Sequence, residues 1–199
     1  MDAIQIQNLT KTYPKFKLHA ASITLPMGYI MGLIGENGAG KSTLIKTMLD
    51  FSYPDAGSIT LLGKDSHQEA VCLKEDIGIV LDTISLPRLC TAKDCNRIFR
   101  NLYANWDEAL YASYLERFQL PDHKMWKTFS LGMQKKLGIA IALSHHPKLL
   151  ILDEVTAGLD PIVRDDFLNL LQEFVSDGAH SVLISSHILS DLEKICDYI

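Results

Sequence analysis

A glycine-rich segment directly follows an apolar run and precedes a helical pattern. The segment reads Gly35-Glu-Asn-Gly-Ala-Gly-Lys-Ser42 and matches the pattern G-x-x-x-x-G-K-S. Glycines let the backbone curl so that its N–H groups surround phosphate oxygens, and the N-terminus of the following helix adds partial positive charge. Such a match arises by chance in roughly one percent of chains of this length, given average glycine usage. The segment therefore predicts a strand, a phosphate-binding loop (P-loop) and a helix, joined in that order.

The side chains of this loop predict a site for ATP with magnesium. Lys41 is placed to reach the terminal phosphates, and the Ser42 hydroxyl is a suitable magnesium ligand. The residues expected to contact ATP in this segment are Gly35, Asn37, Gly38, Ala39, Gly40, Lys41, Ser42 and Thr43. The alternative interpretation is a glycine-rich turn that matches the pattern by chance.

Composition and charge restrict the possible partners. With 47% hydrophobic and 22% charged residues, the 199-residue chain can form the core of one globular domain. Its net charge of −5 argues against nucleic acid as a partner, because nucleic-acid binding normally requires a basic face. No apolar run approaches the roughly 18 residues of a membrane span, and no signal-like segment opens the chain. We therefore expect a cytoplasmic protein, in which the four cysteines stay reduced.

Hydrophobic patterning predicts an α/β arrangement that is interrupted by a helical insert. Strands are expected at 4–9, 18–25, 57–63, 77–81, 149–152 and 181–185. The pattern becomes helical between about 90 and 146, where Asn105 is typical of a helix N-cap. Asp160 followed by proline predicts the start of a further helix. Ser190 and Glu193 have the spacing of a capping box for the last helix.

Two carboxylates, Asp153 and Glu154, end an apolar run that reads as a buried strand. In a P-loop protein the first carboxylate holds magnesium, directly or through water. The second is placed to take a proton from the attacking water. Alone, the segment could equally be a strand that ends in a solvated acidic turn. The P-loop upstream favours the catalytic interpretation.

The segment between these two motifs resembles the signature of ATP-binding cassette (ABC) ATPases, whose common form is L-S-G-G-Q-R-Q-R. It reads Phe129-Ser-Leu-Gly-Met-Gln-Lys-Lys136. Ser130 and Gly132 match the serine and the second glycine, whereas leucine and methionine replace the first glycine and the glutamine. The S-L-G-M form resembles a variant in the branch of antibiotic and lipid-type exporters. Ser130 and the amides around Gly132 are suited to open a helix and bind the γ-phosphate held by a second subunit.

Two further segments follow in the order of the same family. Thr156-Ala-Gly-Leu-Asp160 is similar to the family's D-loop, although Val155 stands where the family usually has proline. His187 resembles the switch histidine, whose implied role is to contact the γ-phosphate and to order Glu154 and water. A lone histidine is more often a surface or core residue. Its position directly after a strand, about 33 residues past Glu154, favours the catalytic interpretation.

Tyr13 and Asp82 are matched to the family by position only. Tyr13 lies ahead of the P-loop, where the family places an aromatic side chain that stacks on adenine. The alternative is a tyrosine packed at a strand end. Asp82 occupies the place of a family glutamine that senses magnesium, but a carboxylate has no amide donor. Asp82 either serves the water shell of the metal, or the sensing role lies elsewhere.

The resemblance covers essentially the whole chain and implies one ABC ATPase domain over residues 1–199. Its implied fold is an α/β P-loop core with an antiparallel β-subdomain and a helical subdomain near 90–146. Family cassettes usually continue past the switch histidine, so we expect a truncated or naturally short C-terminal end at Ile199.

The mechanism implied by the resemblance is a head-to-tail dimer, homomeric or formed with a close paralogue, that sandwiches two ATP molecules. It would power export through a separate transmembrane permease and lie at the cytoplasmic membrane through that permease. The surface near Asp82 and residues 86–102 is expected to dock a cytoplasmic helix of the permease. The alternatives are a soluble ABC ATPase of the translation or DNA-repair type and, from another class, a P-loop kinase.

Overall fold

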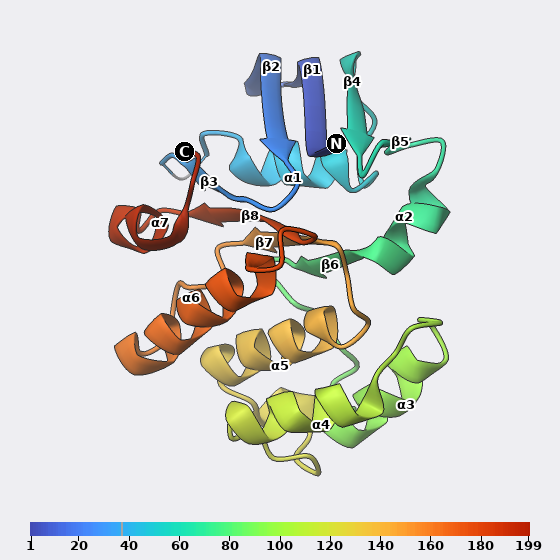
Figure 1. The fold of residues 1–199 in the computed structure, drawn as a ribbon, viewed down its shortest axis with the longest axis vertical. Coiled ribbons are helices and arrows are strands. Elements are labelled where there is room, and N and C mark those ends of the chain that lie inside the picture. The colour runs from blue at the N-terminus through green and yellow to red at the C-terminus, as the bar shows by residue number, and fades with distance from the viewer. Residues whose placement is uncertain (37) are drawn as a thin grey trace.

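Two four-stranded β-sheets organise the part of the chain that the structure describes (Figure 1). The computed structural model describes residues 1–36 and 38–199. Its strands are β1 (Asp2–Tyr13), β2 (Phe16–Pro26), β3 (Ile30–Ile34), β4 (Ala56–Leu61), β5 (Lys64–Asp65), β6 (Ile77–Val80), β7 (Leu149–Asp153) and β8 (Ser181–Ser186). One sheet is antiparallel with the order β2-β1-β4-β5, and the other is parallel with the order β3-β8-β7-β6. This arrangement confirms the predicted α/β core with an antiparallel β-subdomain.

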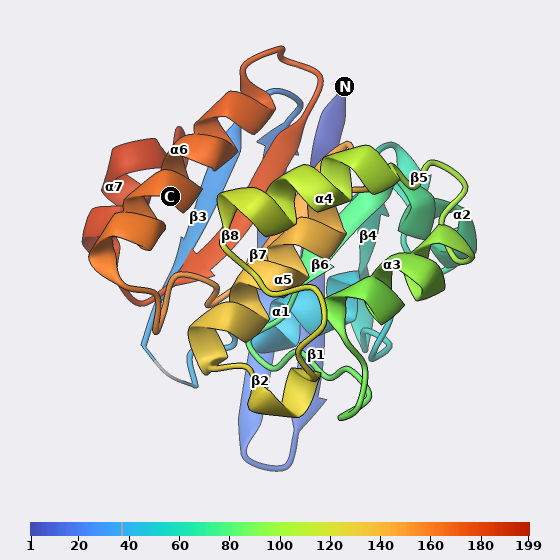
Figure 2. The same cartoon turned by 90° about the horizontal axis from the view of Figure 1, so that it is seen from below.

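The helices fill the space between the sheets and cover the free face of the parallel sheet. They are α1 (Lys41–Met48), α2 (Ala70–Asp76), α3 (Ala92–Arg100), α4 (Glu108–Arg117), the 3₁₀ turn η1 (Trp126–Thr128), α5 (Leu131–Leu143), α6 (Pro161–Val175) and α7 (Leu189–Ile195). Helix α1 lies between the two sheets, and α5 and α6 lie on the opposite side of the parallel sheet (Figure 1). Helices α3 and α4 pack on the outer side of α5, as the view from below shows (Figure 2).

The parallel sheet is buried on both faces, because successive side chains of its strands point to opposite sides. In β7, Leu149 and Ile151 join the core formed with α1 and the antiparallel sheet. Leu150 and Leu152 join the second core, which is formed with α5 and α6. Burial on both faces explains why these strands are continuous apolar runs in the sequence and do not alternate with polar residues.

The parallel topology brings the predicted motifs to one edge of the sheet. Strands β3, β6, β7 and β8 all run in the same direction, so their carboxyl ends meet there. The P-loop follows β3, Asp82 lies two residues after β6, Glu154 follows β7 and His187 follows β8. In open α/β sheets this edge is where ligands bind.

Two helix starts differ from the prediction. Helix α4 is capped by Asp107, whose Oδ1 accepts the Leu110 N–H at 2.8 Å, and Asn105 lies outside the helix. A carboxylate satisfies the free N–H of the first turn, which is why the helix begins after Asp107. Helix α7 begins at Leu189 with Ile188 as its N-cap, so Ser190 lies inside the helix and is not the N-cap. Asp160 caps α6 as predicted.

Among the residues that the structure describes, no helix is both long enough and apolar enough to cross a membrane.

Candidate functional site

A cavity of about 510 Å³ opens where the P-loop follows β3. Its volume lies within the range of roughly 300–1,000 Å³ that is typical of ligand sites. The lining residues are Tyr13, Lys15, Phe16, Glu36, Gly38, Ala39, Gly40, Lys41, Ser42, Thr43, Asp82 and Glu154. The cavity thus brings together residues predicted from four separate segments. Asn37, which was predicted to contact ATP, lies outside the described residues.

The loop requires glycine for its curled conformation. Gly38 and Gly40 have φ values of +86° and +106°, which side-chain-bearing residues rarely adopt. A Cβ on Gly40 would lie 2.6 Å from Cζ of Phe16, so the ring of β2 closes against the bare backbone at this point. The first turn of α1 then begins with the Leu44 N–H donating to the Gly40 carbonyl at 2.9 Å.

Lys41 connects the P-loop with the carboxylate that follows β7. Its Nζ donates to the Gly35 carbonyl at 2.5 Å and to the Glu36 carbonyl at 3.4 Å. The same Nζ lies 3.3 Å from Oε1 of Glu154, and both side chains are mostly buried, with exposed fractions of 9% and 15%. The ammonium group therefore lies among backbone and carboxylate oxygens at the cavity wall.

Glu154 lies between Lys41 and His187. Its Oε2 is 2.7 Å from His187 Nδ1, and its backbone is left-handed, with a φ of +52°. Burial raises the pKa of the Glu154 carboxyl, but the hydrogen bonds with His187 and Lys41 together outweigh burial and leave the pKa below its ordinary value. Glu154 is therefore a carboxylate at neutral pH and can accept a proton.

Asp153 is buried next to Glu154 and is held by β8. Its Oδ1 accepts the Ser185 hydroxyl at 2.5 Å, and its exposed fraction is 3%. Ser185 also accepts the Glu154 N–H, through its carbonyl at 3.2 Å and its hydroxyl at 3.1 Å. Asp153 itself does not line the cavity as the described residues form it.

The oxygen-bearing side chains at the cavity suit magnesium, which needs few protein ligands, better than a metal that is held by protein ligands alone. Ser42 and Asp82 line the cavity, and Asp153 is the residue directly before Glu154, which also lines it. Within residues 1–36 and 38–199, no group of three or more histidine, cysteine or acidic side chains is clustered to hold a metal alone. Magnesium in nucleotide sites usually binds one or two protein oxygens and takes its other ligands from phosphate and water.

Ser130, Gly132 and Asp160 meet in a second hollow of about 360 Å³. Ser130 caps α5, because its hydroxyl accepts the Met133 N–H at 3.3 Å. Asp160 caps α6 through the Val163 N–H at 3.1 Å. The two hollows have no lining residue in common among the described residues. The structure thus joins the signature to the D-loop and keeps both apart from the P-loop of the same chain.

Tyr13 and Asp82 both lie at the cavity. Tyr13 is 41% exposed, and Nζ of Lys11 lies 5.5 Å from the centre of its ring. The Asp82 side chain is 61% exposed, and its Oδ1 is 3.6 Å from Nζ of Lys135.

Lys135 was not predicted as a site residue, although it is a lysine with an exposed fraction of only 1%. Its Nζ donates to the carbonyls of Glu154 at 2.5 Å and Ala157 at 2.8 Å. Lys135, Ile139 and Ala142 have the i, i+4, i+7 spacing of one helix face, and all three are buried. The position of Lys135 on the apolar face of the predicted helix is therefore the sequence signal that could have indicated its burial.

The parallel sheet, the glycine loop with its lysine and the carboxylate that follows β7 define a P-loop nucleotide-binding protein. The family described as "ABC transporter" matches residues 18–157. The chain therefore belongs to the ABC transporter family, of which it is an ATP-binding cassette.

Two relatives and one solved structure illustrate this membership. The bacitracin transport ATP-binding protein BcrA of Enterococcus faecalis is 34% identical over 199 residues, which cover 98% of this chain and 65% of BcrA. The lantibiotic transport ATP-binding protein SrtF of Streptococcus pyogenes is 37% identical over 98% of this chain and 85% of SrtF. A structure described as the ATP binding subunit of an ABC transporter has a TM-score of 0.89 at 28% identity, covering 99% of this chain and 85% of the other.

Proposed function

We propose that the chain binds and hydrolyses ATP with magnesium and thereby powers export through a separate membrane permease. The observation that carries this proposal is the carboxylate of Glu154, held between Lys41 and His187 at the wall of the P-loop cavity. Relatives that are named for bacitracin and lantibiotic transport support transport as the purpose of hydrolysis. Through its permease the chain would lie at the cytoplasmic face of the membrane.

Residues at the cavity and beside it have distinct parts in this proposal. Lys41 and the backbone N–H groups of the P-loop bind the phosphates, and the ring of Tyr13 stacks on adenine. Ser42 and Asp153 would hold magnesium, with Asp82 in reach of its water shell; the metal neutralises charge on the phosphates when bound. Glu154 takes the proton of the attacking water, and His187 fixes the direction of the Glu154 carboxylate.

The second hollow supports a dimer as the working form. Ser130 and Gly132 lie at the N-terminus of α5, where free N–H groups favour a phosphate. Since this hollow is separate from the P-loop cavity, the phosphate that it binds would belong to a nucleotide on a second subunit. Two such chains in head-to-tail contact would complete two sites.

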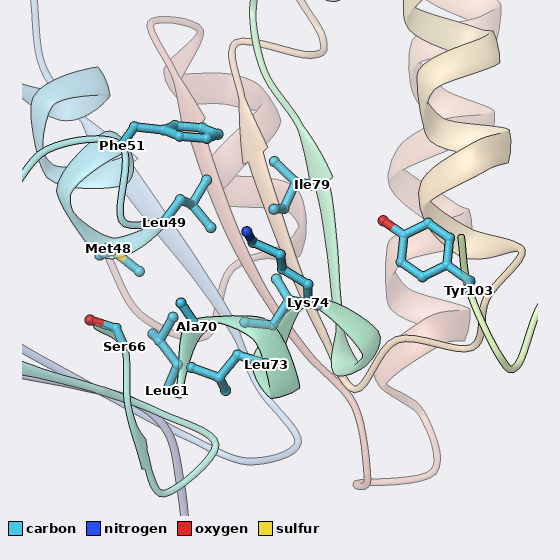
Figure 3. Close-up of a pocket in the computed structure, with 11 residues that line it drawn as sticks. Met48, Leu49, Phe51, Leu61, Ser66, Ala70, Leu73, Lys74, Ile79 and Tyr103 are labelled. Atoms are coloured by element: carbon cyan, nitrogen blue, oxygen red, sulfur yellow. The ribbon is translucent and has the colours of Figure 1, made fainter. Parts of the chain in front are cut away.

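An apolar groove beside the parallel sheet supports docking of the permease. Its volume is about 140 Å³, and its lining includes Leu49, Phe51, Leu73, Ile79 and Tyr103 (Figure 3). Phe51 is 62% exposed, so its ring is available to a partner. We propose this groove as the seat of a cytoplasmic permease helix. Tyr103, which lines the groove, directly follows the predicted docking surface at 86–102 in the chain.

A single substitution tests the enzymatic part of the proposal. Glu154→Gln keeps the shape of the side chain, but its amide is no base for the attacking water. We expect ATP binding, followed with a fluorescent ATP analogue, to persist and magnesium-dependent phosphate release to fall at least a hundredfold. A variant that releases phosphate at the wild-type rate would exclude Glu154 as the base.

A further inference from the structure

Lys135 is a buried cation that contacts two segments, the turn after β7 and the residues after β6. It lies on α5, which runs beneath the parallel sheet (Figure 1), and its side chain is only 2% exposed. Its Nζ contacts the carbonyls of Glu154 and Ala157 and lies 3.6 Å from Oδ1 of Asp82. We propose that Lys135 is a positioning residue for ATP hydrolysis. Lys135 fixes the backbone of Glu154, and Asp82 in turn holds Lys135 in place.

The proposal rests on how the peptide groups around Glu154 are held. The N–H of Glu154 donates to Ser185 on β8, and its carbonyl accepts from Lys135 on α5. Between these two attachments, Glu154 keeps a φ of +52°, which is unfavourable for a residue with a side chain. Such a conformation persists only where the surroundings determine it. Lys135 supplies one of the two attachments and thereby sets the direction of the carboxylate.

Asp82 completes the surroundings of the ammonium group. A buried ammonium has three N–H donors and is costly unless it is paired and hydrogen-bonded. Two carbonyls serve two of the donors of Lys135, and the carboxylate of Asp82 supplies the opposite charge. Because Asp82 also lines the P-loop cavity, Lys135 connects a side chain of the cavity to the backbone of Glu154, the proposed base.

The contact with Ala157 extends this connection into the D-loop. Ala157 lies three residues after Glu154, and its carbonyl accepts from the same Nζ at 2.8 Å. One ammonium group therefore holds both ends of the turn that leaves β7. Removal of this group should loosen the whole turn, whereas the P-loop would keep its own contacts.

The test compares Lys135→Met and Lys135→Arg with a matched control, Lys148→Met. Methionine keeps the unbranched apolar stem of the side chain but lacks the ammonium group, and arginine keeps the charge and N–H donors. Lys148 pairs with Asp76 at 3.0 Å and precedes β7, at the end of the strand remote from Glu154. We expect Lys135→Met to lower kcat at least tenfold with ATP affinity changed less than twofold, and Lys135→Arg to restore part of kcat. Lys148→Met should leave both unchanged.

Two further measurements define the role of Asp82 and guard against misfolding. If Asp82 acts through Lys135, Asp82→Asn should lower kcat in the wild type but have less effect in the Lys135→Met background. Additive losses of kcat in the double variant would overturn the role of Asp82. Melting temperatures identify variants that fail to fold. If Lys135→Met is one of them, Lys135→Gln takes its place, because its amide keeps two N–H donors without the charge. An unchanged kcat in a folded variant, or equal losses in kcat and ATP affinity, would overturn the positioning role.

Hydrogen exchange separates this inference from the proposed function on which it depends. Lys135→Met should speed amide exchange in residues 154–158, because the turn loses its attachment, and Lys148→Met should not. If the wild-type chain hydrolysed no ATP, the proposed function would fail, and exchange alone would then decide the positioning. Unchanged exchange in 154–158 would overturn it whatever the ATPase activity.

Discussion

His187 differs from Lys41 in what its contact with Glu154 can do. Both side chains lie within 3.3 Å of the Glu154 carboxylate, but His187 is 52% exposed and does not line the cavity as the described residues form it. Lys41 lies within the P-loop, where it would contact phosphate whether or not the reaction proceeds. We therefore expect the contribution of His187 to appear in the transition state.

His187→Ala should lower kcat at least tenfold and leave the affinity for ATP nearly unchanged, because only the direction of the Glu154 carboxylate is lost. Steady-state phosphate release and titration with a fluorescent ATP analogue measure the two quantities. Lys41→Ala serves as the comparison, since it should weaken ATP binding itself. Equal losses of kcat and affinity in His187→Ala would point to a simple binding role.

The lowered pKa of Glu154 predicts a pH dependence of stability. Burial raises this pKa, and the hydrogen bonds with His187 and Lys41 lower it more. The carboxylate therefore stabilises the fold above the unfolded pKa of about 4.3, and this stabilisation is lost as pH falls through the lower, folded pKa. Relative to Glu154→Gln, the wild-type melting temperature should fall as the pH is lowered below the unfolded pKa of about 4.3. If the melting temperatures of the two proteins changed with pH by the same amount, this prediction would be wrong.

At the scale of elements, the P-loop and β2 are fitted to each other at Gly40. Gly40→Ala meets both a left-handed backbone and the Phe16 ring, so we expect it to destabilise the chain by about 2–5 kcal/mol. Gly38→Ala is the matched control: its φ is +86°, but, its two chain neighbours aside, no heavy atom of the described residues lies within 4 Å of the added Cβ. It should lose only about 1–2 kcal/mol. Denaturant unfolding measures both.

The Phe16 contact can be tested separately. Combining Gly40→Ala with Phe16→Ala removes the ring that the new methyl group would meet, so the loss relative to Phe16→Ala alone should fall to that of Gly38→Ala. A loss that stays as large as in Gly40→Ala would mean that backbone strain alone accounts for the effect.

The elements differ in how far their sequence predicts them. The P-loop and β7 were predicted because a glycine pattern and a continuous apolar run are local signals. The start of α4 was misplaced by two residues, since Asn105 and Asp107 are both good N-caps and the choice is made by the first-turn contacts of Asp107. Lys135 was missed because its partners lie on other segments and only the fold brings them within reach.

At the scale of the whole molecule, the two separate hollows predict a nucleotide-dependent dimer. With magnesium-ATP, Glu154→Gln should elute as a dimer in size-exclusion chromatography, because the bridging nucleotide is not hydrolysed. Adding Gly132→Arg should return the protein to a monomer that still binds ATP, since Gly132 lies in the second hollow and not in the P-loop cavity. A dimer that forms equally well without nucleotide would contradict this arrangement.

Helix α5 has a consequence for how two sites of such a dimer would work together. Ser130 caps its N-terminus, and Lys135 follows five residues later, a distance of roughly 7.5 Å along a rigid helix. In the proposed dimer, Ser130 would face the nucleotide of the neighbouring subunit, whereas Lys135 holds the backbone of this chain's own Glu154. A shift of α5 at one site would therefore alter the other, and ATP hydrolysis should be cooperative in ATP concentration, with a Hill coefficient above one.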